Sequence, residues 1–346
     1  MSDSMVDRYD RQTRFEPLGS KGQDRIRAAH VLLVGCGALG TSIADTLVRA
    51  GIGKITIIDR DYVELHNLHR QQLFTEEDVK HKVAKAKAAA RYLKSVNTDV
   101  EIKAHVLDFQ PEEAARFVPG VDLIMDGSDN FEVRMLLNDA AYRYEVPWIY
   151  GGVVGSYGLS RSFMLDDGPC LRCLSPYLSL DETCDNDGVI APAVQMVTAM
   201  QSAEAIKMIS GNKSAVSERL RSFDLWENET TAINAERLKD AQCPTCGSNP
   251  TYPELVNKEK GKQIRVLCGG DTVHVRPRER KDVQVEKLQN IQHSTLSSVR
   301  LHEDVATLNY EGCRVVLFKD GRALLHGIDE GDRAEKVYEH VLSLID

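Results

Sequence analysis

Long apolar runs are missing from this sequence, and so is an excess of positive charge. No stretch approaches the about 20 consecutive apolar residues that a membrane-spanning helix needs. The formal net charge is −9, which gives no support for nucleic acid or a membrane surface as a partner. The first residues, MSDSMVDRYDRQTRFEP, lack the hydrophobic core of a secretory signal. We therefore expect a cytoplasmic protein that binds neither nucleic acid nor membrane.

Internal repeats and low-complexity tracts are also missing. The 346 residues are too many for one compact unit, so a main domain with an appendage is expected. A stretch rich in Pro, Lys and Glu follows Pro250 and is typical of a linker. We expect a main domain over residues 1–250, a linker over 251–261 and a small C-terminal α/β unit over 262–346. The role of that last unit stays open between docking of a partner and packing alone.

Strand and helix patterns alternate through the first half of the chain, which predicts an α/β fold with a mostly parallel, Rossmann-like sheet covered by helices. After Tyr150 the rhythm changes, and a mixed continuation of the same sheet is expected. The strands are expected at His30–Val34, Ile55–Asp59, Val100–His105, Val121–Met125, Val146–Tyr150, Gly158–Leu165 and Leu220–Trp226, and the helices at Leu39–Ala50, Lys82–Val96, Phe131–Tyr144 and Val194–Ile209.

The first strand ends in the turn Gly35-Cys36-Gly37-Ala38-Leu39-Gly40, which has the spacing G-x-G-x-x-G. The glycines allow a tight turn, and the following helix offers free N–H groups to a phosphate. Asp59 ends the second strand, where an acid can accept hydrogen bonds from ribose hydroxyls. Nucleotide binding is therefore expected, but this motif alone does not decide which nucleotide.

Three residues further on favour ATP over NAD. Arg70 and Lys82 lie where a polyphosphate tail could run, and cations there can stabilise a phosphate under attack. Asp129 follows a buried strand and can hold Mg²⁺ against the phosphates. Each residue also has an ordinary interpretation: a surface salt bridge for Arg70, a solvated helix lysine for Lys82, and a helix cap for Asp129 and Asn130. The sequence leaves these alternatives open.

The eight cysteines include two C-x-x-C pairs, Cys170/Cys173 and Cys243/Cys246. Four thiolates are enough for one tetrahedral, structural Zn²⁺, which would connect two chain segments separated by 69 residues. Redox activity is the weaker alternative, because neither pair lies at a thioredoxin-like helix start. Cys36, Cys268 and Cys313 are expected to be packing residues.

Together, these residues resemble the sulfur-carrier-protein adenylyltransferases (the ThiF/MoeB family), relatives of the ubiquitin-activating enzymes. The resemblance runs from about Arg8 to Cys246. It rests on R-Y-x-R-Q from Arg8, the glycine turn, the Asp59-x-Asp61 strand end, N-L-x-R-Q from Asn67, Lys82, S-D-N from Ser128 and the two cysteine pairs. The family's usual threonine is Ser128 here, which leaves the acid and the amide in place.

The resemblance implies that ATP and Mg²⁺ bind in the crevice and that the terminal Gly-Gly carboxylate of a ubiquitin-like sulfur carrier protein attacks the α-phosphate. It implies phosphate contacts for Arg70 and Lys82, a metal role for Asp129, and an Arg11 that reaches the neighbouring subunit of a homodimer. It also implies that Cys184 takes part in sulfur or acyl transfer, with a cysteine desulfurase or another sulfur donor as a partner. The nucleotide-binding residues it implies are Gly35, Gly37, Ala38, Gly40, Asp59, Asp61, His66, Asn67, Leu68, His69, Arg70, Lys82, Asp129 and Asn130.

Two other functions remain as alternatives. An NAD(P)-dependent oxidoreductase would use the same glycine turn, but no His/Asp or Lys pair is placed for hydride transfer. A non-catalytic scaffold would be expected to lose Arg70, Lys82 or Asp129, and all three are present. Between thiamine thiazole and molybdopterin biosynthesis, the stretch PWIYGGVVGSYG from Pro147 slightly favours the thiamine branch.

Overall fold

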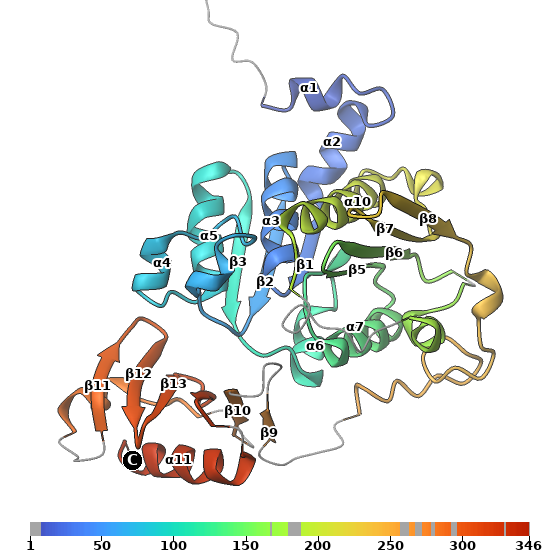
Figure 1. Ribbon diagram of the computed structural model, residues 1–346. Coiled ribbons are helices and arrows are strands. Elements are labelled where there is room, and N and C mark those ends of the chain that lie inside the picture. The colour runs from blue at the N-terminus through green and yellow to red at the C-terminus, as the bar shows by residue number, and fades with distance from the viewer. Residues whose placement is uncertain are drawn as a thin grey trace, which may run out of the picture. The chain divides into compact units, whose positions relative to one another are not determined.

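The structure is a computed structural model, and it describes residues 8–166, 168–178, 188–256, 263–266, 272–277, 281–291, 296–328 and 330–345. These residues form two compact units. The first lies within Met1–Val79 and Ala84–Val256, and the second combines Lys80–Val83 with Asn257–Asp346. Each unit has its own sheet, as the strand pairings show (Figure 1).

The first unit is built on an eight-stranded sheet of order β3-β2-β1-β4-β5-β6-β7-β8. The first five strands of that order pair in parallel, and β6, β7 and β8 continue the sheet in antiparallel pairs. The strands are β1 (His30–Val34), β2 (Lys54–Asp59), β3 (Glu101–Val106), β4 (Leu123–Asp126), β5 (Trp148–Val154), β6 (Tyr157–Phe163), β7 (Leu220–Asp224) and β8 (Glu229–Ile233). The predicted α/β class with a mixed continuation of the sheet is confirmed.

Helices cover both faces of this sheet (Figure 1). Neighbouring residues of β5 show it, because Tyr150 packs in the core beside α7 whereas a Cβ on Gly151 would meet Gln201 of α10. One layer contains α2 (Gly19–Ala28), α3 (Ala38–Ala50), α5 (Lys85–Val96) and α10 (Ala191–Ile209), and the other contains α6 (Pro111–Phe117), α7 (Phe131–Tyr144) and α8 (Leu171–Leu174). The short elements are α1 (Asp10–Thr13), α4 (Glu76–Lys80), η1 (Leu65–Asn67), η2 (Ser175–Tyr177), η3 (Lys213–Ala215) and η4 (Glu236–Leu238).

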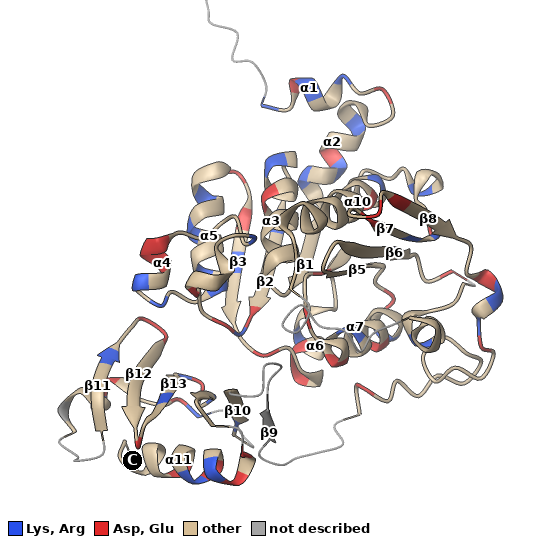
Figure 2. Cartoon of the chain, in the orientation of Figure 1, with Lys and Arg blue, Asp and Glu red and all other residues tan. Residues whose placement is uncertain are grey.

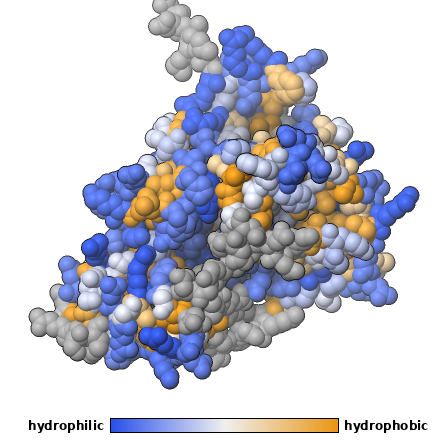
Figure 3. Space-filling model, viewed as in Figure 1, coloured by the Kyte–Doolittle hydropathy of each residue, from blue (hydrophilic) through white to orange (hydrophobic). Residues whose placement is uncertain are grey.

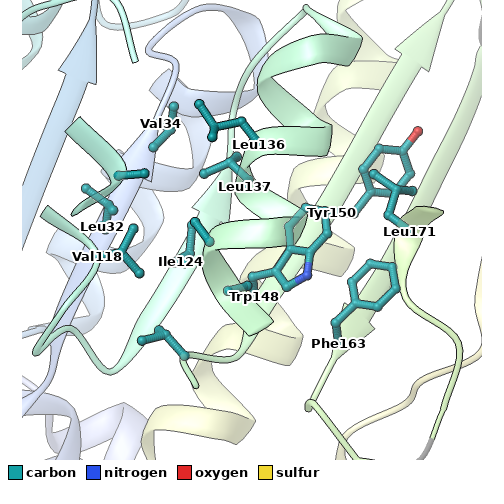
Figure 4. Packing of buried hydrophobic residues seen from close by; sticks show 14 of the residues in the cluster. Leu32, Val34, Val118, Ile124, Leu136, Leu137, Trp148, Tyr150, Phe163 and Leu171 are labelled. Carbon is teal, nitrogen blue, oxygen red and sulfur yellow. The ribbon is translucent and has the colours of Figure 1, made fainter. Parts of the chain in front are cut away.

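The core between the sheet and the α6–α7 layer is continuous from β1 to β6 (Figure 4). Trp148 and Phe163 stack with ring centroids 4.7 Å apart, and both side chains are almost fully buried. Leu171 of α8 joins the same core. Burial of each such side chain contributes about 1.5–3 kcal/mol, so this face fixes the sheet against α7 and α8.

Several predicted element boundaries are wrong. Gly151 and Gly152 do not end the fifth strand, because β5 runs through them to Val154. Glycine is needed inside this strand, since a Cβ on Gly151 would lie 2.5 Å from Cδ of Gln201. The helix predicted from Lys82 begins at Lys85 instead. The edge strand β8 was not predicted from the sequence.

The second unit has a six-stranded sheet of order β11-β12-β13-β14-β10-β9, in which all pairings are antiparallel. One amphipathic helix, α11 (Gly331–Ser343), buries Val337 and Val341 in the core of the unit. The strands are β9 (Gln263–Val266), β10 (Thr272–Arg276), β11 (Leu296–Leu301), β12 (Val305–Tyr310), β13 (Cys313–Phe318) and β14 (Ala323–His326), with η5 (Val285–Asn290) between β10 and β11. Strands β11 and β12 were not predicted from the sequence.

The surface carries hydrophobic side chains among hydrophilic ones (Figure 3). Of the large hydrophobic residues that the structure describes, Trp226 is the most exposed, with 75% of its surface accessible. Among the residues that the structure describes, no helix has the length and apolarity to cross a membrane.

Candidate functional site

The carboxyl ends of β1, β2 and β4 form the candidate site. Strand β1 pairs with β2 on one side and with β4 on the other. The connections after β1 and after β3 therefore run to opposite sides of β1, which makes this the point where the strand order reverses. Open α/β sheets bind ligands in the crevice at such a switch point. The glycine turn follows β1, Asp59 is the last residue of β2, and the loop that carries Asp129 follows β4.

The glycine turn packs against the loop after β4 at backbone distance. Gly35 has a φ of +89°, and a Cβ on it would lie 2.4 Å from the carbonyl oxygen of Gly127. A Cβ on Gly40 would lie 2.0 Å from the carbonyl oxygen of Gly35. These two glycines are therefore required for packing, since a side chain on Gly35 would push the turn away from the loop after β4 and one on Gly40 would push α3 away from the turn.

Gly37 differs from its two neighbours in the motif. The nearest atom to a Cβ built on Gly37 is Nε2 of Gln71, at 3.7 Å, so this side of the turn has room. Gly37 is the N-cap of α3, and no side chain caps that helix. The first N–H groups of α3, beginning at Ala38, can therefore serve an anion.

Gln71 lies beside this turn and was not proposed from the sequence. It is 3% exposed, and its Oε1 atom is buried without a hydrogen-bond partner. A buried acceptor in this state favours a ligand or water that donates to it. No motif signals this role, because the sequence does not show that the glutamine of N-L-x-R-Q is buried.

Asp59 ties the end of β2 to the glycine turn. Its Oδ2 accepts a hydrogen bond from the backbone N–H of Cys36 at 2.6 Å, and its Oδ1 accepts one from that of Asp61 at 2.7 Å. Burial raises the pKa of Asp59 to about 6, although Lys85 opposes the rise. Each carboxylate oxygen keeps a second acceptor position, so Asp59 can still accept from ribose hydroxyls.

The structure brings a further cation, Lys85, to these acids. Lys85 is 8% exposed, and its Nζ lies 3.4 Å from Oδ2 of Asp61. Burial lowers its pKa, but Asp61 and Asp59 more than compensate and raise the pKa of Lys85 well above its usual range. Lys82 precedes α5 with a φ of +47° and groups with the second unit.

A second cation, Arg60, lies among the same acids and was also not proposed from the sequence. Its Nη1 lies 3.3 Å from Oδ1 of Asp108 and its Nε lies 3.8 Å from Oδ1 of Asp61. Burial lowers the pKa of Arg60, but the effect of the nearby acids Asp61, Asp108 and Asp129 is larger, so the net pKa is raised. Acidic and basic residues therefore gather where β2 ends (Figure 2), and acids outnumber cations in the group Asp59, Asp61, Asp108, Asp129, Arg60 and Lys85.

The N-L-x-R-Q segment separates a buried residue from exposed ones. Asn67 is 4% exposed, and its Oδ1 accepts from the backbone N–H of Glu64, which holds the turn η1 in place. Arg70 is half-buried, and its Nη1 lies 3.1 Å from the carbonyl oxygen of His66 and 3.4 Å from Nε2 of His69. His66 and His69 are exposed and Leu68 is half-buried. Arg70 thus has no carboxylate among the contacts that the structure describes for it.

Asp129 and Asn130, in the loop after β4, make different contacts. Asn130 is the N-cap of α7, and its Oδ1 accepts from the N–H groups of Glu132 at 2.8 Å and Val133 at 3.4 Å. Asp129 is exposed and makes none of the capping bonds. Because Asn130 caps the helix, the carboxylate of Asp129 remains available for a cation.

The N-terminal arm presents Arg11 to solvent. Tyr9 is 5% exposed, and its hydroxyl accepts from Nδ2 of Asn97 at 2.8 Å. Gln12 donates from Nε2 to the carbonyl oxygen of Ala50 at 2.9 Å. These two anchors dock the arm on the first unit and leave the side chain of Arg11 between them exposed.

The two cysteine pairs meet in one cluster, with all four Sγ atoms within 4.8 Å of one another. The sulfur–sulfur distances Cys170–Cys243, Cys173–Cys246 and Cys170–Cys173 are 3.6, 3.5 and 3.9 Å. A tetrahedron with Zn–S bonds of about 2.3 Å has sulfur atoms about 3.8 Å apart, whereas a disulfide is about 2.05 Å long. The four thiols therefore fit a tetrahedral metal ion.

Buried bonds support this cluster from α7. Asp139 is fully buried and accepts from Thr245, from Nη2 of Arg172 and from the backbone N–H of Glu254. The N–H of Thr245 in turn points at Sγ of Cys243, 3.4 Å away. Such bonds orient metal ligands, and here they connect both cysteine pairs to one helix.

We expect Cys243→Ser to remove the bound metal and to lower the melting temperature. Loss of about 4 kcal/mol falls in the exceptional range that metal loss produces. In a domain of this size it corresponds to roughly 8–16 °C in Tm. Zinc content by plasma emission and thermal unfolding by circular dichroism would measure both effects. Cys313→Ala, in the second unit, is the control that should keep its metal, and a fully metal-loaded Cys243→Ser protein would contradict the metal assignment.

The remaining cysteines divide into two groups. Cys36 is fully buried, and burial raises the pKa of its thiol, so Cys36 is a packing residue as expected. Cys313 is buried in the core of the second unit. Cys184 and Cys268 lie outside the described residues, so their predicted roles stay predictions.

Comparison with known proteins gives one consistent result. The model of the ThiF family matches residues 9–245. The sulfur carrier protein ThiS adenylyltransferase of Bacillus subtilis (strain 168) is 41% identical over 335 residues, which cover 96% of this chain and 98% of that protein. The sulfur carrier protein adenylyltransferase of Thermus thermophilus is 34% identical over 262 residues, covering 73% of this chain and 95% of that protein.

Solved structures agree on the fold. Escherichia coli MccB in complex with MccA-N7isoASN superimposes with a TM-score of 0.62 at 24% identity, over 70% of this chain and 75% of that chain. This likeness concerns the fold alone. The family match and the two relatives decide against the oxidoreductase alternative, and the chain belongs to the ThiF family.

Proposed function

We propose that this protein uses ATP to adenylate the C-terminal carboxylate of a ubiquitin-like sulfur carrier protein. The observation that carries this proposal is the convergence of Lys85, Arg60 and the exposed Asp129 beside a glycine turn with an uncapped helix. A dinucleotide needs the glycine turn and Asp59, but not this set of cations and acids. The near full-length likeness to the Bacillus relative favours the thiamine branch over the molybdopterin branch.

In the proposed reaction, a carboxylate oxygen of the carrier attacks the α-phosphorus of ATP. The bond between the α-phosphorus and the bridging oxygen to the β-phosphate breaks. The products are the carrier acyl-adenylate and pyrophosphate, so atoms and electrons balance without an oxidant or reductant. Activation of the carboxylate in this form precedes thiocarboxylation by a sulfur donor.

The residues at the site supply charge and position. The N-terminus of α3 and Gly37 leave room for phosphate, and Asp59 can accept from the ribose. Lys85 and Arg70, together with the Lys82 expected from the sequence, can neutralise the charge that develops on the phosphates. Asp129 can hold Mg²⁺, for which its oxygen ligand and the local excess of acids are suited.

We further propose a homodimer in which Arg11 of one subunit serves the site of the other. The anchoring of the arm by Tyr9 and Gln12 supports this, because it leaves the guanidinium of Arg11 exposed at a fixed place. If sites are shared, Arg11→Ala and Asp129→Asn proteins should each be inactive but regain activity when their subunits are exchanged in a mixture. Mixing without any gain of activity would rule out shared sites.

Carrier-dependent exchange of labelled pyrophosphate into ATP tests the proposed reaction. Exchange is expected only when a Gly-Gly-tailed carrier is present, and carriers of the thiamine and molybdopterin types should be compared side by side. Truncation of the two glycines is the matched control on the carrier. The proposal is wrong if no carrier of either type supports exchange.

Cys184→Ala should slow carrier thiocarboxylation, and a normal rate would exclude the covalent role of Cys184.

A further inference from the structure

We infer that Arg134 is a positioning residue that fixes the loop Asp126–Asn130 and thereby the place where Asp129 holds magnesium. This inference rests on the proposed function. It adds a residue that the motifs do not identify, because Arg134 lies one turn into α7 and reaches back under the loop. Four groups of contacts support it.

The guanidinium of Arg134 contacts three different parts of the site. Its Nε lies 3.2 Å from Oδ2 of Asp126, and its Nη2 donates to the carbonyl oxygens of Ser128 at 2.9 Å and Gly151 at 3.1 Å. It also lies over the ring of Tyr150, with the guanidinium carbon 5.3 Å from the ring centroid. One side chain thus ties the end of β4, the loop and β5 together. The planar fork of arginine suits this task, and the single ammonium of lysine does not.

The loop is also held from inside. Oδ1 of Asp126 accepts from the N–H of Ser128 at 2.9 Å and from its hydroxyl at 2.6 Å. The side chain of Asp126 is fully buried, and burial raises its pKa while Arg134 and Ser128 oppose the rise. Arg134 therefore favours the ionised form of this buried acid at the base of the loop, against the effect of burial.

The α10 layer provides the third support. Nε2 of Gln201 donates to the carbonyl oxygen of Asp126 at 2.9 Å from the opposite face of the sheet. On the other flank, Asn130 is fixed as the cap of α7. Asp129 is the exposed residue in a loop whose neighbours on both sides are bonded.

Fixing a metal-binding carboxylate in this way matters because catalysis depends on position. A displacement of about 1 Å can cost on the order of 10²-fold in rate, and loss of a supporting residue typically costs about 10–100-fold in metal affinity or activity. If Arg134 acts through Asp129, its loss should change the magnesium requirement. A purely structural arginine would change stability and leave the magnesium requirement alone.

Arg134→Lys is the variant of choice, because it keeps a cation beside Asp126 but cannot reach both carbonyl oxygens. We expect the Mg²⁺ concentration for half-maximal carrier-dependent exchange to rise by about 10–100-fold. Arg143→Lys, an exposed position in the same helix, is the matched control and should leave that concentration unchanged. An unchanged magnesium requirement in Arg134→Lys, with full exchange activity, would overturn the inference.

A second measurement does not depend on activity. Amide hydrogen exchange followed by mass spectrometry should show faster exchange in peptides that cover Asp126–Asn130 in Arg134→Lys, with β1 and β2 unaffected. Equal protection of this loop in both proteins would overturn the positioning role. Absence of pyrophosphate exchange in the unaltered protein would instead reject the proposed function, so the two failures are distinguishable.

Discussion

Asp129→Asn is expected to abolish carrier-dependent pyrophosphate exchange, by about 10³-fold or more. Loss of a metal-holding carboxylate removes several kcal/mol of charge stabilisation, and each 1.36 kcal/mol is tenfold in rate. The fold should survive, because Asn130 rather than Asp129 caps α7 and Asp129 is exposed. Exchange rates at saturating ATP and carrier would measure the effect.

Two controls show whether a loss of exchange comes from the Asp129 carboxylate rather than from a change in the fold. Zinc content and melting temperature of Asp129→Asn should equal those of the unaltered protein. Glu132→Gln removes an exposed carboxylate three residues further along and should keep exchange activity. An Asp129→Asn protein with normal exchange would remove Asp129 from the magnesium site.

Lys85→Met is expected to lower kcat/KM for ATP on the order of 10²-fold. Lys85 is buried at the candidate site, with its Nζ 3.4 Å from Oδ2 of Asp61. Steady-state exchange kinetics of this variant and of the unaltered protein, measured in parallel, would give the effect. Lys85→Arg keeps the charge and should fall between Lys85→Met and the unaltered protein.

The pH dependence gives Lys85→Met a second readout. Burial raises the pKa of Asp59 to about 6, and Lys85 holds it from rising further. Without this cation the carboxyl should stay protonated to higher pH, and the acidic limb of the activity profile should move to higher pH. An active Lys85→Met protein whose acidic limb does not move would remove Lys85 from the site.

The sequence predicts the nucleotide-binding half of the fold because its motifs sit at the ends of short buried strands. The predicted His30–Val34 and Phe131–Tyr144 match β1 and α7, since apolar runs and a clear N-cap set these boundaries. The choice between a cap and a metal ligand at Asp129 and Asn130 could not be made from the sequence, because both residue types cap helices well. The structure shows Asn130 as the cap.

Other parts of the site depend on contacts that leave no local pattern. Lys85 was not proposed, because a helix predicted from Lys82 gives no sign that Lys85 is buried against Asp61. In the structure Ala84 pairs with Tyr62 in an isolated bridge, and α5 starts at Lys85. Arg60 and Arg134 become notable only through the buried acids around them. Surface charge and buried charge look alike in a sequence, so these residues could not be identified there.

The wide spacing of the two cysteine pairs has a consequence for the order of folding. Cys173 and Cys243 are separated by 69 residues, and α10, β7 and β8 lie within that interval. During synthesis the metal can find four ligands only after the antiparallel edge of the sheet has left the ribosome. Closing a long loop costs only a little more entropy than closing a short one, so bringing the two distant cysteine pairs together carries a small entropic penalty. Metal capture should therefore be a late event that locks a first unit whose sheet is already complete.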